Sequence, residues 1–414
     1  MTNNKYLSSI SKIFSMEIFA KAIFSVISLG VIRFLSEEEF ATYIISLTTI
    51  SIITSSIGAI FNRLFIAGKF NFEKYSFLPF LSIQGLLIVF LFFLFLPLKE
   101  IYEGNLGLVF LVSSLQIFFI FIQTSFQKEL NFFSYYSSEY IRLCIYLIAF
   151  ILLAVNDLLN TKNILIVQAG SVGIASMLFV SKLKIKNESF LFQKIFSLLQ
   201  KIFLGSNKYL ILYSLIVVFM SGLDTLLLRI FDDKNQVAIF GAAFTYYGIL
   251  QSILYAVNKL YLPMIQKTKS LEEINLAMTT LNALNIKYLS ILFVLAIALS
   301  PAIIPLIDNG RYPDSILIFQ ILATSSFFSL LFSPYKNIIF KFSDNKYIFS
   351  LYLKSFLLIY IFLLPNVIIK YHSLGVAIVF LINWFIVNYI SFLRAKKILK
   401  IIDKFGWESM SFKS

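Results

Sequence analysis

Charged residues inside apolar stretches give the first indication of chemistry. Glu17 and Lys21 are four residues apart, a spacing that places both side chains on one face of a helix. Arg142 and Asp224 lie inside two other apolar stretches. Because an ionised side chain is costly at mid-membrane depth, such residues usually face a partner or a water-filled cavity. We therefore expect Lys21 and Arg142 to bind an anionic group, and Glu17 and Asp224 to act in coupling or gating.

Each of these four residues also fits a purely structural role. Glu17 and Lys21 can neutralise each other near the inner membrane surface, where the long lysine side chain reaches water. Arg142 can anchor a helix end to lipid headgroups, and Asp224 can form an internal hydrogen bond or ion pair. The sequence leaves both interpretations open.

A short motif containing Arg63 returns later in the chain with Lys259 at the matching position. The two copies, 196 residues apart, read Asn62-Arg63-Leu64-Phe65-Ile66 and Asn258-Lys259-Leu260-Tyr261-Leu262. Symmetric cations of this kind can receive a phosphate or pyrophosphate at the inner mouth of a cavity, since the arginine fork binds phosphate through paired hydrogen bonds. Basic flanking of a membrane span is the alternative.

Arg33 and Arg229 are separated by the same 196 residues, and each precedes an acidic turn, Glu37–Glu39 in one case and Asp232-Asp233 in the other. Self-similarity at long period in an apolar chain is typical of transporters built from two related halves. Chance similarity between apolar segments is the competing explanation. We expect the two arginines to form an outer mouth, or to pair with the acidic turns in a structural role.

The composition excludes a soluble globular protein. Hydrophobic residues make up 59% of the 414 residues and charged residues 14%, whereas soluble proteins carry about 25% charged residues. The single cysteine, Cys144, and the single histidine, His372, are too few for an internal disulfide or a His/Cys metal cluster, so we expect no metal and no cofactor. No GxxxxGK[ST] nucleotide loop occurs, so transport would draw on an ion gradient, the membrane potential or substrate flow.

We predict an all-α membrane protein of about twelve transmembrane helices, because apolar stretches of roughly 20 residues span a bilayer. Six spans form a bundle in residues 1–181 and six form a second bundle in residues 208–398. A basic amphipathic cytoplasmic linker, 182–207, joins them, and 399–414 is a cytoplasmic tail. An even number of spans per half predicts a parallel internal repeat. The expected spans are 10–34, 40–66, 77–98, 105–127, 135–155, 162–181, 208–231, 237–262, 286–307, 313–340, 347–369 and 372–396.

The basic residues predict that both termini are cytoplasmic. With this orientation, most of the 35 lysines and arginines lie in inside loops and tails, as the positive-inside bias requires. The net charge of +14 then faces anionic lipid headgroups and needs no nucleic acid partner. The predicted external loops are about ten residues or fewer, too short for an enzyme domain. The chain is therefore expected to be a transporter.

Five segments carry a family resemblance that covers essentially the whole chain. Ile32–Tyr43 matches an Arg-x-Leu-Gly-x-Glu-Glu-Phe-Gly-x-Tyr turn, with Ser36 and Ala41 at the glycine positions. The others follow in order: Gly222–Leu228 with its aspartate, Phe240–Ala243, the Asn309–Tyr312 turn, and Leu374–Ile378. In these segments the chain resembles the Wzx-type O-antigen and capsule flippases of the multidrug/oligosaccharidyl-lipid/polysaccharide exporter superfamily.

The resemblance implies a multi-pass protein of the bacterial plasma membrane that flips an undecaprenyl-pyrophosphate-linked oligosaccharide by alternating access. It implies a central cavity lined mainly by spans one, two, seven and eight, with Lys21, Arg63 and Lys259 as cations for the pyrophosphate and Asp224 as a coupling or gating carboxylate. Polysaccharide polymerase machinery is an expected partner, and a nucleotide is not.

Two other functions stay open. A cation/drug antiporter of the same superfamily would favour acidic residues in its cavity, whereas basic residues predominate here. A polyprenyl-linked sugar polymerase or glycosyltransferase could use Glu37–Glu39 as a catalytic base. Such enzymes usually need a larger external loop than this chain is predicted to have.

Overall fold

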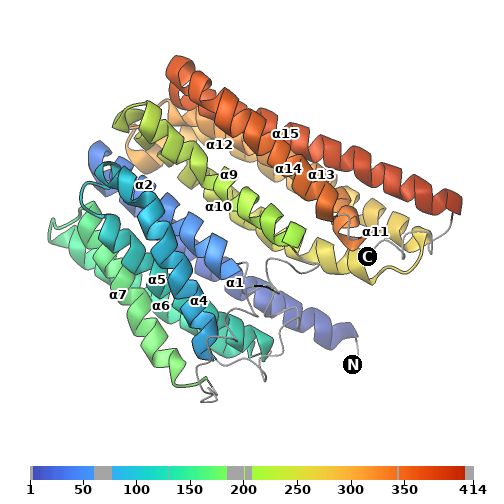
Figure 1. The fold of residues 1–414 in the computed structure, drawn as a ribbon, viewed down its shortest axis with the longest axis horizontal. Helices are drawn as coiled ribbons and strands as arrows, with labels where there is room; N and C mark the ends of the chain where they lie inside the picture. Colours follow the sequence, from blue (N-terminus) through green and yellow to red (C-terminus); the bar gives the residue numbers. More distant parts are fainter. Residues whose placement is uncertain are drawn as a thin grey trace. The chain divides into compact units, whose positions relative to one another are not determined.

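The computed structural model describes residues 3–59, 77–129, 131–183, 200, 208–342 and 345–405. Every regular element in these ranges is a helix (Figure 1). The chain divides into two compact units, unit 1 (Met1–Ile230) and unit 2 (Phe231–Ser414).

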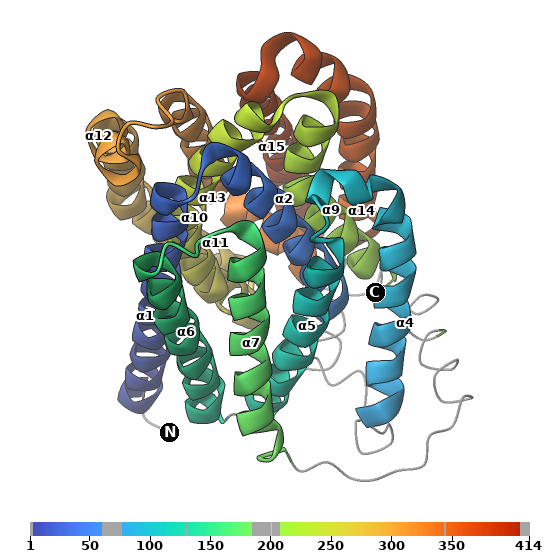
Figure 2. The ribbon, with the colours of Figure 1, turned by 90° about the vertical axis from the view of Figure 1, so that its left-hand side faces the viewer.

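The described part of unit 1 contains seven α-helices, whose bounds are given below. Figure 2 shows α5, α6 and α7 side by side, in agreement with their contacts. A π-helical turn, Ser55–Ala59, extends α2, and a 3-10 segment, Leu96–Tyr102, follows α4. The helices are α1 (Asn3–Phe34), α2 (Glu37–Thr54), α4 (Phe77–Phe95), α5 (Leu106–Lys128), α6 (Phe132–Val155), α7 (Thr161–Val180) and α9 (Lys208–Phe231).

The acidic turn Glu37–Glu39 begins α2. The Ser36 hydroxyl accepts a hydrogen bond from the Glu39 amide at 3.3 Å and caps the helix, and carboxylates in a first helical turn are stabilised by the helix dipole. Glu39 also ties α2 to α7. Its carboxylate accepts from the Thr161 amide at 2.7 Å, and its carbonyl accepts from the Thr161 hydroxyl at 2.7 Å.

Helix α9 packs against α2, which places it in unit 1. A Cβ atom at Gly222 would lie 2.5 Å from the Cδ1 atom of Ile52, so a larger residue would require the Ile52 side chain to move. The two compact units meet after Ile230. The sequence-based domains, with a second bundle that begins at residue 208, stay a prediction. The expected linker, 182–207, lies almost entirely outside the described residues.

Unit 2 is arranged around α13, which packs against α10, α12 and α15. Two π-helical segments interrupt its helices, at Asn285–Leu289 and Phe356–Leu363. Helix α15 contains a kink at His372, whose φ of 52° and ψ of −143° are not helical. The helices are α10 (Lys234–Lys267), α11 (Leu271–Leu284), α12 (Ser290–Asp308), α13 (Ser315–Lys341), α14 (Asn345–Ser355) and α15 (Leu364–Phe405).

The apolar stretches expected to span a membrane fall on helices wherever they are described. In this part of the chain, nine helices are long and apolar enough to cross a bilayer. Large apolar side chains face outward, such as Phe93 at 64% exposed and Met177 at 76%, as a lipid-facing surface requires. The amphipathic helix α11 was not expected. Twelve crossings, the internal repeat and the cytoplasmic termini stay predictions.

Candidate functional site

A buried ion pair lies inside helix α6. Arg142 is 6% exposed, and its guanidinium donates two hydrogen bonds to the Glu139 carboxylate. The Nη2–Oε1 distance is 2.6 Å and the Nε–Oε2 distance is 3.1 Å. This two-point geometry is the strongest form of the arginine–carboxylate interaction. The three-residue spacing places both side chains on one face of the helix.

Helix α5 completes the shell around this pair. The Gln123 side chain donates from Nε2 to Glu139 Oε2 at 3.1 Å, so the same carboxylate oxygen accepts from two helices. The Arg142 guanidinium lies 5.8 Å from the centre of the Phe119 ring, within the range of a cation–π contact. Glu139 is thus fixed by partners on both α5 and α6.

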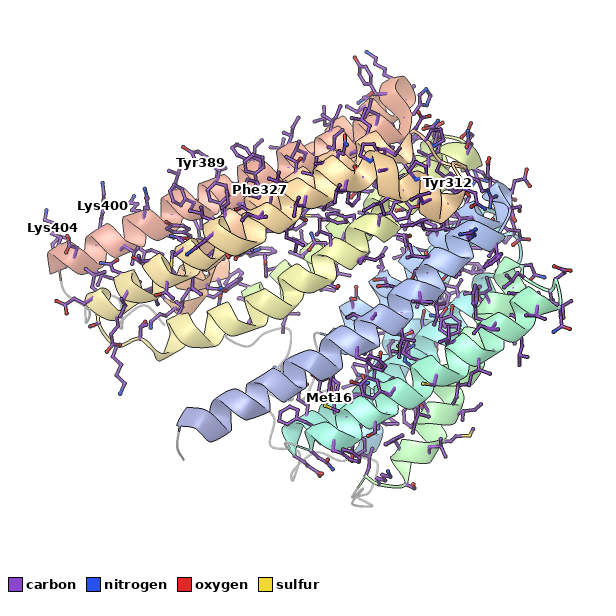
Figure 3. The ribbon with its side chains drawn as sticks, turned by 180° about the vertical axis from the view of Figure 1, so that it is seen from behind. Met16, Tyr312, Phe327, Tyr389, Lys400 and Lys404 are labelled. Carbon is purple, nitrogen blue, oxygen red and sulfur yellow. The ribbon has the colours of Figure 1, made fainter. Side chains whose placement is uncertain are left out.

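Helix α1, which carries Lys21, packs against α6. The Tyr140 hydroxyl donates to the Met16 carbonyl at 2.7 Å, and the Tyr140 and Phe19 rings meet edge to face at 5.7 Å. Met16 accordingly lies where α1 runs beside α6 (Figure 3). On this docked helix, the exposed Lys21 interacts electrostatically with Glu139. We call Lys21, Gln123, Glu139 and Arg142 the charged cluster.

Arg142 lies well inside the helix that carries it. At a rise of 1.5 Å per residue, Arg142 is about 15 Å along α6 from Phe132. At such depth an isolated charge costs several kcal/mol, and a matched partner offsets that cost. Among the described side chains of the charged cluster, two cations, Arg142 and Lys21, interact with the one carboxylate of Glu139. Since Arg142 is held by Glu139, the exposed Lys21 is the cation best placed to meet an anion.

The charged cluster revises one expectation and adds two residues. Arg142 does not anchor a lipid headgroup, because its guanidinium is buried and bound to Glu139. Sequence reasoning missed Glu139 and Gln123, although the i, i+3 spacing of Glu139 and Arg142 within one apolar stretch was a usable signal. The side chain of Glu17 lies outside the described residues, so its pairing with Lys21 stays a prediction.

Asp224 is buried at 1% exposure on α9. It follows Gly222, the residue that lets α9 approach α2, and its neighbour Thr225 is also buried at 3%. The interior of unit 1 therefore contains a second carboxylate besides Glu139. A role for Asp224 in coupling or gating stays a prediction.

The two arginines expected at an outer mouth lie in the last turns of their helices, Arg33 exposed on α1 and Arg229 partly exposed on α9. A cation at a helix C-terminus is stabilised by the helix dipole. In unit 2, Asp233 caps α10 by accepting from the Gln236 amide at 2.9 Å, and Asp232 Oδ2 lies 2.9 Å from His372 Nδ1. An outer mouth and arginine–carboxylate pairs stay predictions.

The phosphate-binding expectation for the repeated motif is not tested by the described residues. Arg63 lies outside them, and for Lys259 only the backbone position on α10 is described. The geometry of a shared phosphate therefore stays a prediction.

No protein-family model and no curated protein matches the chain. Several solved structures are similar in fold, and three of them are described below. The lipid II flippase MurJ, in an inward closed conformation, has a TM-score of 0.72 and 16% identity, with 93% of this chain and 87% of that chain covered. An inward-facing multidrug resistance transporter of the MATE family in the MOP superfamily has a TM-score of 0.63 and 11% identity, covering 93% and 96%.

The third is a MOP superfamily transporter from Pyrococcus furiosus, described as having a binding pocket of reversed polarity. Its TM-score is 0.56 at 12% identity, with coverage of 95% of this chain and 96% of that chain. At these identities the comparison concerns the fold. The chain has the helical fold that these flippase and multidrug transporter structures share.

Proposed function

We propose that this chain flips an undecaprenyl-pyrophosphate-linked oligosaccharide from the cytoplasmic to the outer leaflet of the bacterial plasma membrane, for O-antigen, capsule or related polysaccharide synthesis. The observation that carries the proposal is the charged cluster, a buried arginine held by a carboxylate with the exposed Lys21 beside it, inside an apolar helical unit. The fold shared with MurJ supports the proposal, because the name of that protein, lipid II flippase, states that it flips a lipid.

The chemistry of the substrate fits a site of this kind. A pyrophosphate group is compact and negatively charged, and it must cross the apolar interior with its sugar. A cation inside the bundle lowers the cost of that passage. Lys21 suits this task because its ammonium is a compact point charge on a flexible stem, whereas Arg142 is already held by Glu139.

The repeated cations extend the proposal along the transport path. We assign Arg63 and Lys259 to the inner mouth, where they receive the pyrophosphate, and Arg33 and Arg229 to the outer mouth. Movement of one charge through the membrane potential is worth about 2.3 kcal/mol per 100 mV, so the potential can contribute to the energy of translocation.

A cation or drug antiporter is the second candidate. The buried carboxylate Asp224 favours it, because a carboxylate inside a membrane helix bundle can bind a proton or a cation. The fold likeness to multidrug transporters supports this function equally well.

Transport in proteoliposomes distinguishes the two candidates. The assay would measure how fast a fluorescent undecaprenyl-pyrophosphate oligosaccharide leaves the outer leaflet, using a membrane-impermeant reductant. We expect the wild type to flip this lipid, Lys21→Met to be strongly impaired and Lys21→Arg to retain most activity. The exposed Lys162→Met on α7 is a matched control. Absence of flipping, together with cation-driven drug uptake, would instead identify an antiporter.

A second test concerns the repeated motif. If Arg63 and Lys259 share one phosphate, the double alanine variant loses much more transport than either single variant. Normal transport by the double variant, at normal protein level, would remove both residues from the mechanism.

A further inference from the structure

A stripe of aromatic rings on α15 ends in a row of lysines. Its residues recur at intervals of three or four, so they lie on one face of the helix. Figure 3 shows Tyr389, Lys400 and Lys404 on the same side of α15. We call this surface the α15 stripe: Phe385, Tyr389, Phe392, Lys396, Lys400 and Lys404.

The rings of the α15 stripe form one continuous apolar surface. Phe385 and Tyr389 stack at 5.9 Å with an interplanar angle of 4°, and Tyr389 and Phe392 stack at 6.1 Å and 29°. The Lys396 ammonium lies 4.5 Å from the centre of the Phe392 ring. The stripe therefore passes from apolar to cationic without a break. Phe385 is 38% exposed and Tyr389 43%, so their faces are available to a neighbour.

Aromatic side chains of helix α13 pack against these rings and hold them in place. Phe332 contacts Phe385 at 6.3 Å and Tyr389 at 6.2 Å, and Tyr335 meets the Phe392 ring edge to face at 4.7 Å. Because the rings are already held in place, a ligand that lies along them loses little free energy in ordering them.

The charge and the length of the α15 stripe indicate what occupies it. Lys396, Lys400 and Lys404 are all exposed, and Asp403 is the one acidic residue in this stretch of the helix. The ammonium groups therefore favour an anionic partner. From Phe385 to Lys396 the helix rises about 16 Å, close to half of the roughly 30 Å hydrocarbon core of a bilayer. The rings then lie at acyl-chain depth and the lysines at phosphate depth.

We infer that the α15 stripe binds an anionic membrane phospholipid, with its phosphate on Lys396, Lys400 and Lys404 and one acyl chain along the rings. This lipid site is separate from the charged cluster and does not depend on the proposed flippase activity. An aligned row of rings that ends in lysines fits a lipid better than a soluble acidic protein, because a soluble protein would not contact rings at the depth of the acyl chains.

Native mass spectrometry of the full chain tests this inference. The purified protein in detergent is offered equal amounts of phosphatidylglycerol and phosphatidylcholine, and the retained lipids are counted. Each lysine near an anionic surface changes binding roughly fivefold. We therefore expect the wild type to prefer phosphatidylglycerol over phosphatidylcholine. A triple glutamine variant should show a preference that is at least about tenfold weaker. The variant replaces Lys396, Lys400 and Lys404.

The matched control removes the same number of charges elsewhere in unit 2. It replaces three other exposed lysines by glutamine: Lys346, Lys354 and Lys370. We expect this control to keep the wild-type preference. Equal losses in both triple variants would show only a general charge effect, and equal retention of the two lipids by the wild type would refute the site directly.

Two further measurements test the acyl-chain track and the identity of the occupant. Phe385→Leu with Tyr389→Leu keeps every charge, and we expect it to retain several-fold less phosphatidylglycerol; unchanged retention would show that the rings take no part. Displacement of phosphatidylglycerol by inorganic phosphate or by an acidic polypeptide would contradict a membrane lipid as the ligand. Displacement by polyprenyl phosphate at lower concentration would reassign the site to the carrier lipid.

Discussion

Removal of Glu139 should destabilise the protein more than removal of Arg142. Without Glu139, the buried Arg142 guanidinium loses both of its charged hydrogen bonds, and Lys21 adds a second cation nearby. Without Arg142, Glu139 keeps the Gln123 amide and the electrostatic attraction of Lys21. The two partners of one ion pair are therefore not equivalent.

The size of the effect follows from burial. Loss of one partner of a buried ion pair costs about 3–5 kcal/mol. The Arg142 side chain is 8% exposed and that of Glu139 is 24% exposed. A partly exposed carboxylate that keeps the Gln123 hydrogen bond tolerates loss of its partner better than a buried guanidinium does. We expect about 3 kcal/mol for Glu139→Leu and about 1–2 kcal/mol for Arg142→Leu. Because a well-packed apolar pair can replace a buried ion pair at little cost, the double variant should be nearly as stable as the wild type.

Apparent unfolding temperatures of the detergent-solubilised variants test this ranking. They should fall in the order wild type, double variant, Arg142→Leu and Glu139→Leu, and the double-mutant cycle should show a coupling of at least about 1 kcal/mol. Lys162→Leu, on the exposed start of α7, controls for loss of a charge. Equal effects of the two single changes, or a double variant as unstable as their sum, would refute the asymmetric cluster.

Three further predictions concern unit 1 and the linker. Gly222→Leu should lower stability by about 1–3 kcal/mol, because its side chain would overlap Ile52; thermal unfolding checks this, and an unchanged unfolding temperature would count against the close α2–α9 contact. Asp224→Asn should impair transport while the protein still inserts; wild-type rates at every pH would argue against coupling. In a Cys144→Ser background, a cysteine within 182–207 should resist an impermeant thiol reagent added outside cells, and labelling there would reverse the predicted orientation.

The helices could be predicted from the sequence because their signal is local. Apolar stretches of membrane-spanning length determined where helices such as α5, α7 and α9 begin and end to within a few residues. The π-helical turns could not be anticipated, since hydropathy is insensitive to backbone geometry. The His372 kink did separate two stretches that the sequence treats as two spans.

The charged cluster could be predicted only in part. Arg142 and Lys21 were found because a charge inside an apolar stretch is visible in the sequence. Glu139 lies near the start of its span among serine and tyrosine residues, where a carboxylate attracts no notice. Its contact with Gln123 depends on how α5 and α6 rotate against each other, which no local pattern determines. The same holds for α9, whose place beside α2 follows from a tertiary contact at Gly222.

The central claim is that the substrate is a lipid-linked oligosaccharide carried across the membrane. The most direct measurement deletes the gene in its host and locates the lipid-linked oligosaccharide with a membrane-impermeant glycan-modifying probe on spheroplasts. We expect complete repeat units to accumulate on the cytoplasmic leaflet of the deletion strain. The wild-type gene should restore their display on the outer leaflet, and the Lys21→Met variant should not. Complete single units displayed outside but never polymerised, or an unchanged glycan with altered drug resistance, would contradict it.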